Sequence, residues 1–90
     1  MTEFDEEYWI KTVSKDGCEI RYCPNKTEAI CLAAVQADGY AIRFIENPSN
    51  EVIEVAIQQM QNIYNRSFAY IINWFDYNNI PIPFHVRLSL

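Results

Sequence analysis

An internal repeat of 22 residues constrains the fold more than any other feature of the sequence. The stretch TVSKDGCEIRYC, residues 12–23, returns as AVQADGYAIRFI, residues 34–45, and the chain's only two glycines occupy the same place in both copies. Periods of 20 to 50 residues indicate stacked supersecondary units that bury their apolar faces against one another. The matching positions are Val13 and Val35, Asp16 and Asp38, Gly17 and Gly39, Ile20 and Ile42, Arg21 and Arg43, and Tyr22 and Phe44.

The segments before the two glycines predict helices. EEYWIKTVSK places Trp9 and Val13 on one side and charged residues on the other, as in an amphipathic helix. EAICLAAVQA is apolar around almost its whole circumference, which indicates a helix covered by neighbours on both sides. Thr27 is expected to cap this second helix. Each glycine is expected to close the preceding helix in the left-handed conformation.

The pieces after the glycines, CEIRYC and YAIRFI, fit either a short strand or a helical turn. The 22-residue period favours the helical interpretation, because a long helix, a glycine and a short helix fill one unit. The repeated Asp16 and Arg21, and Asp38 and Arg43, suit either a repeated ligand site or hydrogen bonds that support the turns. We favour turn support, since charged groups at helix ends commonly serve this role.

A third unit is expected to open with Asn47 as helix cap and Pro48 at the first helical position. No glycine recurs at position 61, so the third helix is predicted to continue over residues 48–75. Its apolar row advances by about 3.6 residues per turn, as in an α-helix. The row consists of Ile53, Ile57, Met60, Tyr64, Phe68, Ile71 and Phe75.

The last residues predict a different structure. Pro81 and Pro83 favour an extended chain, and Phe84, Val86 and Leu88 then alternate with polar residues, as in a strand. The predicted fold is therefore all-α. It is one domain, residues 1–90, with a stack of helical repeats of about 22 residues, a long third helix, and an extended tail at 77–90 that ends in a short strand.

The units TEAICLAAVQADGYAIRFIENP and PSNEVIEVAIQQM resemble the short tandem helical repeats of uncharacterised bacterial and phage proteins, in which PSxEVxLAAV is followed by GYAIxYI. The resemblance covers about residues 7 to 60. It implies a helical fold and a phage or mobile-element origin, but no chemistry, because the family has no known function. The chain departs from the family pattern after residue 60.

The charge is divided unequally along the chain. Residues 1–54 carry eleven acids and five bases, whereas residues 55–90 carry one acid and two bases. The acidic front disfavours direct binding of nucleic acid and favours a basic protein surface as partner. The sequence contains no apolar run long enough for a membrane span and no secretory signal. We expect a cytoplasmic protein, located in the host cytoplasm if a phage encodes it.

Catalytic and metal sites are not expected. The chain has no GxSxG, Walker A or HExxH motif. Cys18, Cys23, Cys31 and His85 would have to converge to hold zinc, but their spacing matches no common ligand pattern. No cofactor is expected. An enzyme or metal protein is therefore the least favoured of the three functional interpretations.

The leading interpretation is a non-enzymatic protein-interaction module, in the manner of small acidic anti-CRISPR-like inhibitors that block a host nuclease or defence complex. The acids at predicted helix starts either complement the helix dipole or bind a partner. The alternative is a scaffolding protein that self-associates, as a homodimer through residues 84–90. The candidate partner-binding residues are Glu3, Asp5, Glu6, Glu7, Tyr70, Trp74 and Tyr77.

Overall fold

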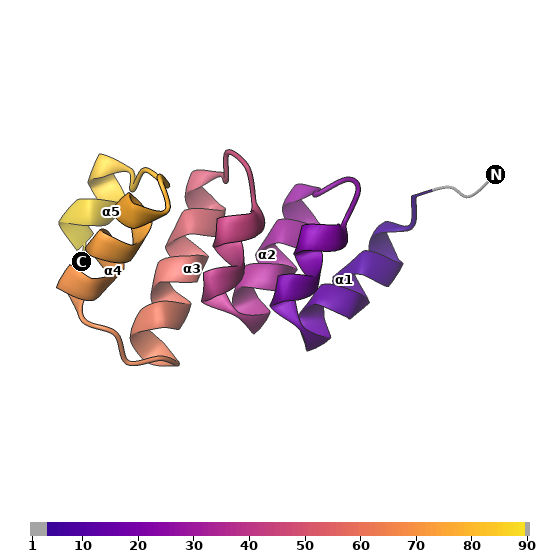
Figure 1. The fold of residues 1–90 in the computed structure, drawn as a ribbon, viewed down its shortest axis with the longest axis horizontal. Helices are drawn as coiled ribbons and strands as arrows, with labels where there is room; N and C mark the ends of the chain where they lie inside the picture. Colours follow the sequence, from indigo (N-terminus) through magenta and orange to yellow (C-terminus); the bar gives the residue numbers. More distant parts are fainter. Residues whose placement is uncertain (1–3, 90) are drawn as a thin grey trace.

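The computed structural model describes residues 4–89, and every regular element in this range is a helix (Figure 1). The all-α prediction is thus confirmed. In chain order the elements are α1 (Glu6–Lys15), the 3-10 helix η1 (Gly17–Tyr22), α2 (Glu28–Ala37), the 3-10 helix η2 (Gly39–Phe44), α3 (Asn50–Asn62), α4 (Phe68–Tyr77) and α5 (Phe84–Ser89).

The helices follow one another along an elongated molecule of 47 × 22 × 19 Å. α1 packs on α2, and α2 packs on α3, while η1 and η2 lie against these helices (Figure 1). The N-terminal ends of α1, α2 and α3 lie along one edge, the upper edge in Figure 1, and the α3–α4 loop lies along the opposite edge. α1 and α4–α5 form the two ends of the molecule.

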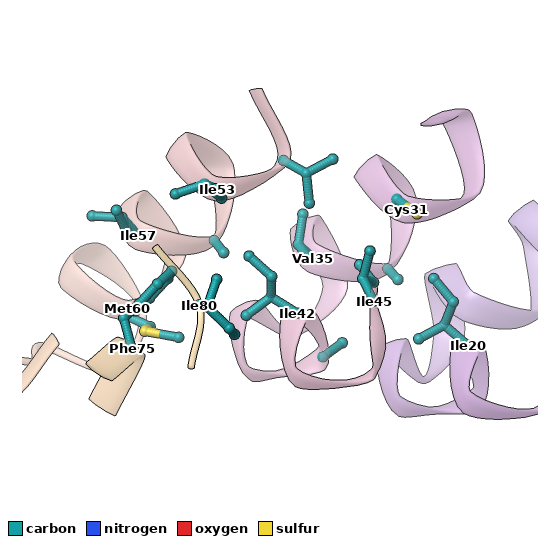
Figure 2. Close-up of a cluster of buried hydrophobic side chains, with 14 of the residues drawn as sticks. Ile20, Cys31, Val35, Ile42, Ile45, Ile53, Ile57, Met60, Phe75 and Ile80 are labelled. Carbon is teal, nitrogen blue, oxygen red and sulfur yellow. The ribbon is translucent and has the colours of Figure 1, made fainter. Parts of the chain in front are cut away.

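One core of buried apolar side chains connects these elements. α2 contributes Ile30, Cys31, Ala34 and Val35, consistent with its predicted central position. Figure 2 shows side chains of α2, η2, α3 and α4 meeting in this core, together with Ile80 from the segment after α4. No polar or charged residue of the described range is buried.

The glycines do not have the predicted conformation, because neither Gly17 nor Gly39 has a positive φ. Their role is close packing instead. A Cβ atom at Gly17 would fall against the carbonyl oxygen of Ala34, and one at Gly39 would lie 2.7 Å from the carbonyl oxygen of Ala56. Each 3-10 helix can therefore approach the following α-helix only if it begins with a residue that has no side chain.

Side-chain caps define the starts of the helices. The Thr27 hydroxyl accepts a hydrogen bond of 3.3 Å from the N–H of Ile30, as predicted. The prediction for α3 is wrong, since Ser49 rather than Asn47 is its cap and its first residue is Asn50. Asn47 has a φ of 53°, and this left-handed residue turns the chain ahead of the cap.

The predicted long third helix is wrong. α3 ends at Asn62 and α4 begins at Phe68, after a loop in which Asn65 has a φ of 53°. Ser67 caps the new helix by accepting a hydrogen bond of 3.2 Å from the N–H of Tyr70. The periodic row belongs to two helices: its members in α3 and its last two members in α4 are buried, whereas Tyr64 and Phe68 between them are exposed.

The predicted C-terminal strand is wrong as well, because residues 84–89 form α5. Pro83 precedes the helix, and its carbonyl accepts hydrogen bonds from the N–H groups of Val86 and Arg87 at 3.0 and 2.9 Å. A lone strand would leave its backbone groups without partners, whereas a helix pairs them internally. Tyr77, expected in the extended tail, is the last residue of α4.

Candidate functional site

α1, α2 and α3 start on the same edge of the molecule (Figure 1). Exposed acids stand at or just before each of these helix starts, and we call this surface the acidic edge. Glu3, predicted to belong to this surface, lies outside the described residues. The acidic edge consists of Asp5, Glu6, Glu7, Glu28, Glu46 and Glu51.

The acids of the edge have different local roles. The Asp5 carboxylate caps α1 by accepting a hydrogen bond of 3.1 Å from the N–H of Tyr8. Glu28 accepts a hydrogen bond of 2.6 Å from the Ser49 hydroxyl, which connects the starts of α2 and α3. Within residues 4–89, Glu6, Glu7, Glu46 and Glu51 form no ion pair. Their negative charge is therefore directed to solvent.

A polar groove of about 360 Å³ lies between the turns that precede α2 and α3. Glu28, Glu46 and Ser49 line it, together with Lys26. The Lys26 ammonium donates a hydrogen bond of 2.9 Å to the Cys23 carbonyl, so it does not pair with either carboxylate. The groove makes this part of the edge concave, with carboxylates on both walls.

A second cluster lies at the α3–α4 loop, on the opposite edge, and we call it the tyrosine cluster. Its members come from η2 and its cap, from the loop and from α4. The rings of Tyr64 and Trp74 approach the Tyr40 ring edge-on, with centroids 4.9 and 5.3 Å away. The cluster consists of Asp38, Tyr40, Tyr64, Arg66, Tyr70 and Trp74.

Hydrogen bonds join these residues into one network. The Tyr64 hydroxyl donates to the Asp38 carboxylate at 2.9 Å. The Arg66 Nε donates to the Tyr40 hydroxyl at 3.1 Å, and this hydroxyl donates to the Tyr70 hydroxyl at 3.3 Å. The Arg66 guanidinium also lies 4.5 Å from the centre of the Tyr70 ring, a cation–π geometry.

The network alters the acidity of its groups. Burial, and then the hydrogen bond to Asp38, raises the pKa of Tyr64. Burial, and then the hydrogen bond to Tyr70, raises the pKa of Tyr40. The hydrogen bond to Tyr40 raises the pKa of Arg66. Tyr40 and Tyr64 therefore remain neutral donors, and Arg66 remains charged, throughout the physiological range.

The three predicted aromatic residues have different environments. Tyr70 and Trp74 belong to the tyrosine cluster, where Trp74 is half-buried and also packs edge-on against Phe75 at 5.4 Å. Tyr77 is 86% exposed at the end of α4. The structure thus separates the aromatic residues from Asp5, Glu6 and Glu7, which lie at the other end of the molecule (Figure 1).

The sequence reasoning did not identify Tyr40, Tyr64 or Arg66 as site residues. One signal was available, because Tyr40 replaces Cys18 at the equivalent position of the repeat. The two aspartates of the repeat support the turns, as predicted: Asp16 accepts from the N–H of Cys18 at 3.1 Å, and Asp38 accepts from that of Tyr40 at 3.0 Å.

The repeated arginines stack on aromatic rings rather than support the turns by hydrogen bonds. The Arg21 guanidinium lies 4.8 Å from the centre of the Tyr22 ring, and that of Arg43 lies 4.7 Å from the centre of the Phe44 ring. The Arg21 guanidinium also lies 5.7 Å from the centre of the Phe44 ring, so Phe44 contacts both arginines and connects η1 to η2.

Two of the thiols lie beside these surfaces: Cys18 next to the tyrosine cluster and Cys31 at the groove of the acidic edge.

Cys18 contacts the tyrosine cluster directly. Its Sγ lies 3.6 Å from the Asp38 carboxylate, and burial followed by the charge of Asp38 raises its pKa. Cys23 and Cys31 are buried, and their thiols contact backbone carbonyls. The Nε2 of His85 lies 3.5 Å from a carboxylate oxygen of Glu54. Among residues 4–89, no group of three or more His, Cys, Asp or Glu side chains is arranged to hold a metal.

No helix in the described part of the chain has both the length and the apolar character needed to cross a membrane. The chain matches no protein family, no curated protein and no solved structure.

Proposed function

We propose that the protein is a non-enzymatic interaction module that docks its acidic edge on a basic surface of a nucleic-acid-binding protein. The observation that carries the proposal is the row of exposed carboxylates at the starts of three successive helices, of which Glu6, Glu7, Glu46 and Glu51 have no ion pair within residues 4–89. An unpaired row of one sign attracts a surface of the opposite sign and accelerates association with it.

The spacing of the row supports this partner. Packed helices lie about 8–10 Å apart, so acids on successive helix starts recur at roughly that interval along the edge. Surfaces that bind nucleic acid carry lysine and arginine residues placed to meet a regular line of phosphates. A line of carboxylates occupies such a surface in competition with nucleic acid.

We infer that α1 with η1 and α2 with η2 are units of a tandem repeat. Both α-helices have ten residues, both 3-10 helices have six, and the corresponding elements begin 22 residues apart. The resemblance to phage and bacterial repeats supports a phage or mobile-element origin. With that origin, we propose that the acidic edge serves an anti-CRISPR-like inhibitor that acts in the host cytoplasm on a nuclease or defence complex.

The proposal is tested with a partner captured from the host cell and then purified. Reversing Glu6, Glu7 and Glu51 to Lys is expected to slow association, and raising the salt concentration is expected to slow association of the unaltered protein. Glu19→Lys is the matched control, because Glu19 lies in the first turn of η1, next to Lys15 and Asp16 at the C-terminal end of α1, on the edge opposite the helix starts. A nucleic acid ligand of the partner should compete.

An association rate that is indifferent to salt and to the three reversals would refute this function. Equal effects of Glu19→Lys and of a single acidic-edge reversal would show that only the net charge matters.

A second candidate function is scaffolding by self-association through residues 84–90, now with a helix as the contact. Phe84 and Leu88 lie one turn apart on α5 and are 75% and 72% exposed, whereas Val86 is buried. Sedimentation velocity over a range of concentrations tests this candidate. Replacement of Phe84 and Leu88 by Ser should abolish any dimer, and a monomer at every concentration would exclude it.

A further inference from the structure

Arg66 is an exposed residue whose side chain is held in a fixed position. Its Nε hydrogen-bonds to Tyr40, and its guanidinium lies over the ring of Tyr70. Its backbone N–H donates to the Met60 carbonyl at 2.9 Å, which holds the loop itself. Within residues 4–89, the two terminal nitrogens of the guanidinium have no hydrogen-bond or ion-pair partner.

A chain of donors connects Arg66 to Tyr70. Arg66 donates to the Tyr40 hydroxyl, which in turn donates to the Tyr70 hydroxyl. The Tyr70 oxygen is therefore the acceptor in this contact, and its own hydrogen remains available. Tyr70 is 37% exposed, so solvent reaches it. Consecutive hydrogen bonds polarise one another, which makes the last hydroxyl a stronger donor.

The nearest carboxylate of the network does not neutralise Arg66. Asp38 accepts hydrogen bonds from the Tyr64 hydroxyl at 2.9 Å and from the N–H of Tyr40 at 3.0 Å, and the Cys18 thiol lies 3.6 Å from its second oxygen. It forms no ion pair with Arg66. Within the tyrosine cluster, the Asp38 carboxylate therefore has hydrogen-bond donors, whereas the terminal nitrogens of Arg66 have no partner among residues 4–89.

We propose that Arg66 and Tyr70 form a binding site for a carboxylate of another protein. Arg66 Nε and the Tyr70 hydroxyl both lie within 3.3 Å of the Tyr40 oxygen, so a single carboxylate can accept from the terminal guanidinium nitrogens and from Tyr70. The planar guanidinium matches a carboxylate with two parallel hydrogen bonds. Because both groups are already held by Tyr40, little side-chain entropy is lost on binding.

The site prefers a carboxylate to a phosphate group because Asp38 lies in the same network and the chain carries a net charge of −5. The site lies on the edge opposite the acidic edge. It attracts negatively charged groups, whereas the acidic edge attracts positively charged ones. It is therefore a second binding site, and it does not depend on the function proposed above.

The carboxylate comes either from an Asp or Glu side chain or from a chain terminus, and three short peptides distinguish the sources. The first is a capped Gly-Glu-Gly with an amidated end, the second an acetylated triglycine with a free carboxylate, and the third a capped Gly-Gln-Gly without charge. Each is titrated into the isotope-labelled full chain at constant ionic strength, and NMR follows the Arg66 Nε–H signal and the backbone amides of 67–71.

At least one charged peptide should shift these signals to saturation, and the neutral peptide should not. Tyr70→Phe and Arg66→Lys should each weaken binding about tenfold, as expected for the loss of a hydrogen bond to a charged group. Tyr8→Phe is the matched control, because it removes an exposed hydroxyl on α1, outside the tyrosine cluster. It should bind like the unaltered chain.

Three results would overturn the proposal. These are the absence of saturation with both charged peptides, an equal response to the neutral peptide, and equal weakening by Tyr8→Phe and Tyr70→Phe. Tyr70→Phe keeps the ring over which Arg66 stacks but removes the acceptor of the Tyr40 hydroxyl, so its stability should fall slightly. A melting transition well above the temperature of the titration shows that any loss of binding does not arise from unfolding.

Discussion

The Tyr64 hydroxyl and the Asp38 carboxylate are joined by a hydrogen bond of 2.9 Å across 26 residues of sequence. Asp38 also caps η2 through the N–H of Tyr40, while Tyr64 lies in the loop between α3 and α4. The Asp38 carboxylate thus connects the turn between α2 and η2 to the α3–α4 loop, where the 22-residue pattern of the sequence ends. The contact orients the loop that carries Arg66.

Replacement of Tyr64 by Phe should lower the free energy of unfolding by about 0.5–1 kcal/mol, the usual net value of a hydrogen bond that is partly accessible to water. The ring and its edge-on contact with Tyr40 remain. Urea unfolding followed by circular dichroism measures the change. Tyr8→Phe is the control, since Tyr8 is 57% exposed and its hydroxyl forms no hydrogen bond within the described range. Equal stability of both variants would contradict this prediction.

The same hydrogen bond should make stability depend on alkaline pH. Burial and Asp38 raise the pKa of folded Tyr64 above the ordinary value of 10.0. The folded state therefore favours the neutral phenol, so this stabilisation is complete below pH 10 and is lost as the pH rises through the folded pKa. The stability difference between the unaltered chain and Tyr64→Phe should be constant from pH 6 to 9 and should shrink above pH 10. A difference that grows above pH 10 would show that the sign is wrong.

The buried thiol of Cys31 should resist alkylation. Burial, followed by the charge of Glu28, raises its pKa to about 11, and only the thiolate reacts. With iodoacetamide at pH 8 and mass spectrometry, half-exposed Cys18 should be modified before Cys31. The same raised pKa affects stability. Folding favours the neutral Cys31 thiol, so the stabilisation from burying this thiol is present below its ordinary pKa of 9.0 and is lost as the pH rises to about 11. Faster labelling of Cys31 than of Cys18 at pH 8 would contradict the buried position.

Local signals predicted the helices that lie before each glycine. Apolar periodicity and the Thr27 cap act within one helix, so the sequence contains the information directly. The break between α3 and α4 was missed because the apolar residues of two separate helices happen to continue one period. Asn65, in the left-handed conformation, and the capping Ser67 were the local signals that compete with it.

The candidate site was predictable only in part. Helix starts place Glu6, Glu28 and Glu51 on one edge, because α1, α2 and α3 run in the same direction. The tyrosine cluster depends on contacts over 26 to 30 residues, from Tyr40 to Arg66 and Tyr70, and no local pattern specifies them. The prediction of a C-terminal strand was wrong for a similar reason, because alternation of apolar residues does not indicate whether a partner strand exists.

The packing role of Gly39 leads to a prediction that separates it from a conformational role. Its backbone φ is not positive, so the strain of a substitution comes from the added Cβ, 2.7 Å from the Ala56 carbonyl oxygen and 3.0 Å from the Gln59 Cβ. Gly39→Ala should therefore destabilise the protein by about 1–3 kcal/mol, as overpacking does. Gly39→Asn should be at least as harmful, although asparagine tolerates the left-handed conformation. Urea unfolding of both variants decides the matter. If Gly39→Asn were more stable than Gly39→Ala, the glycine would be needed for a left-handed backbone conformation rather than for the close contact between η2 and α3.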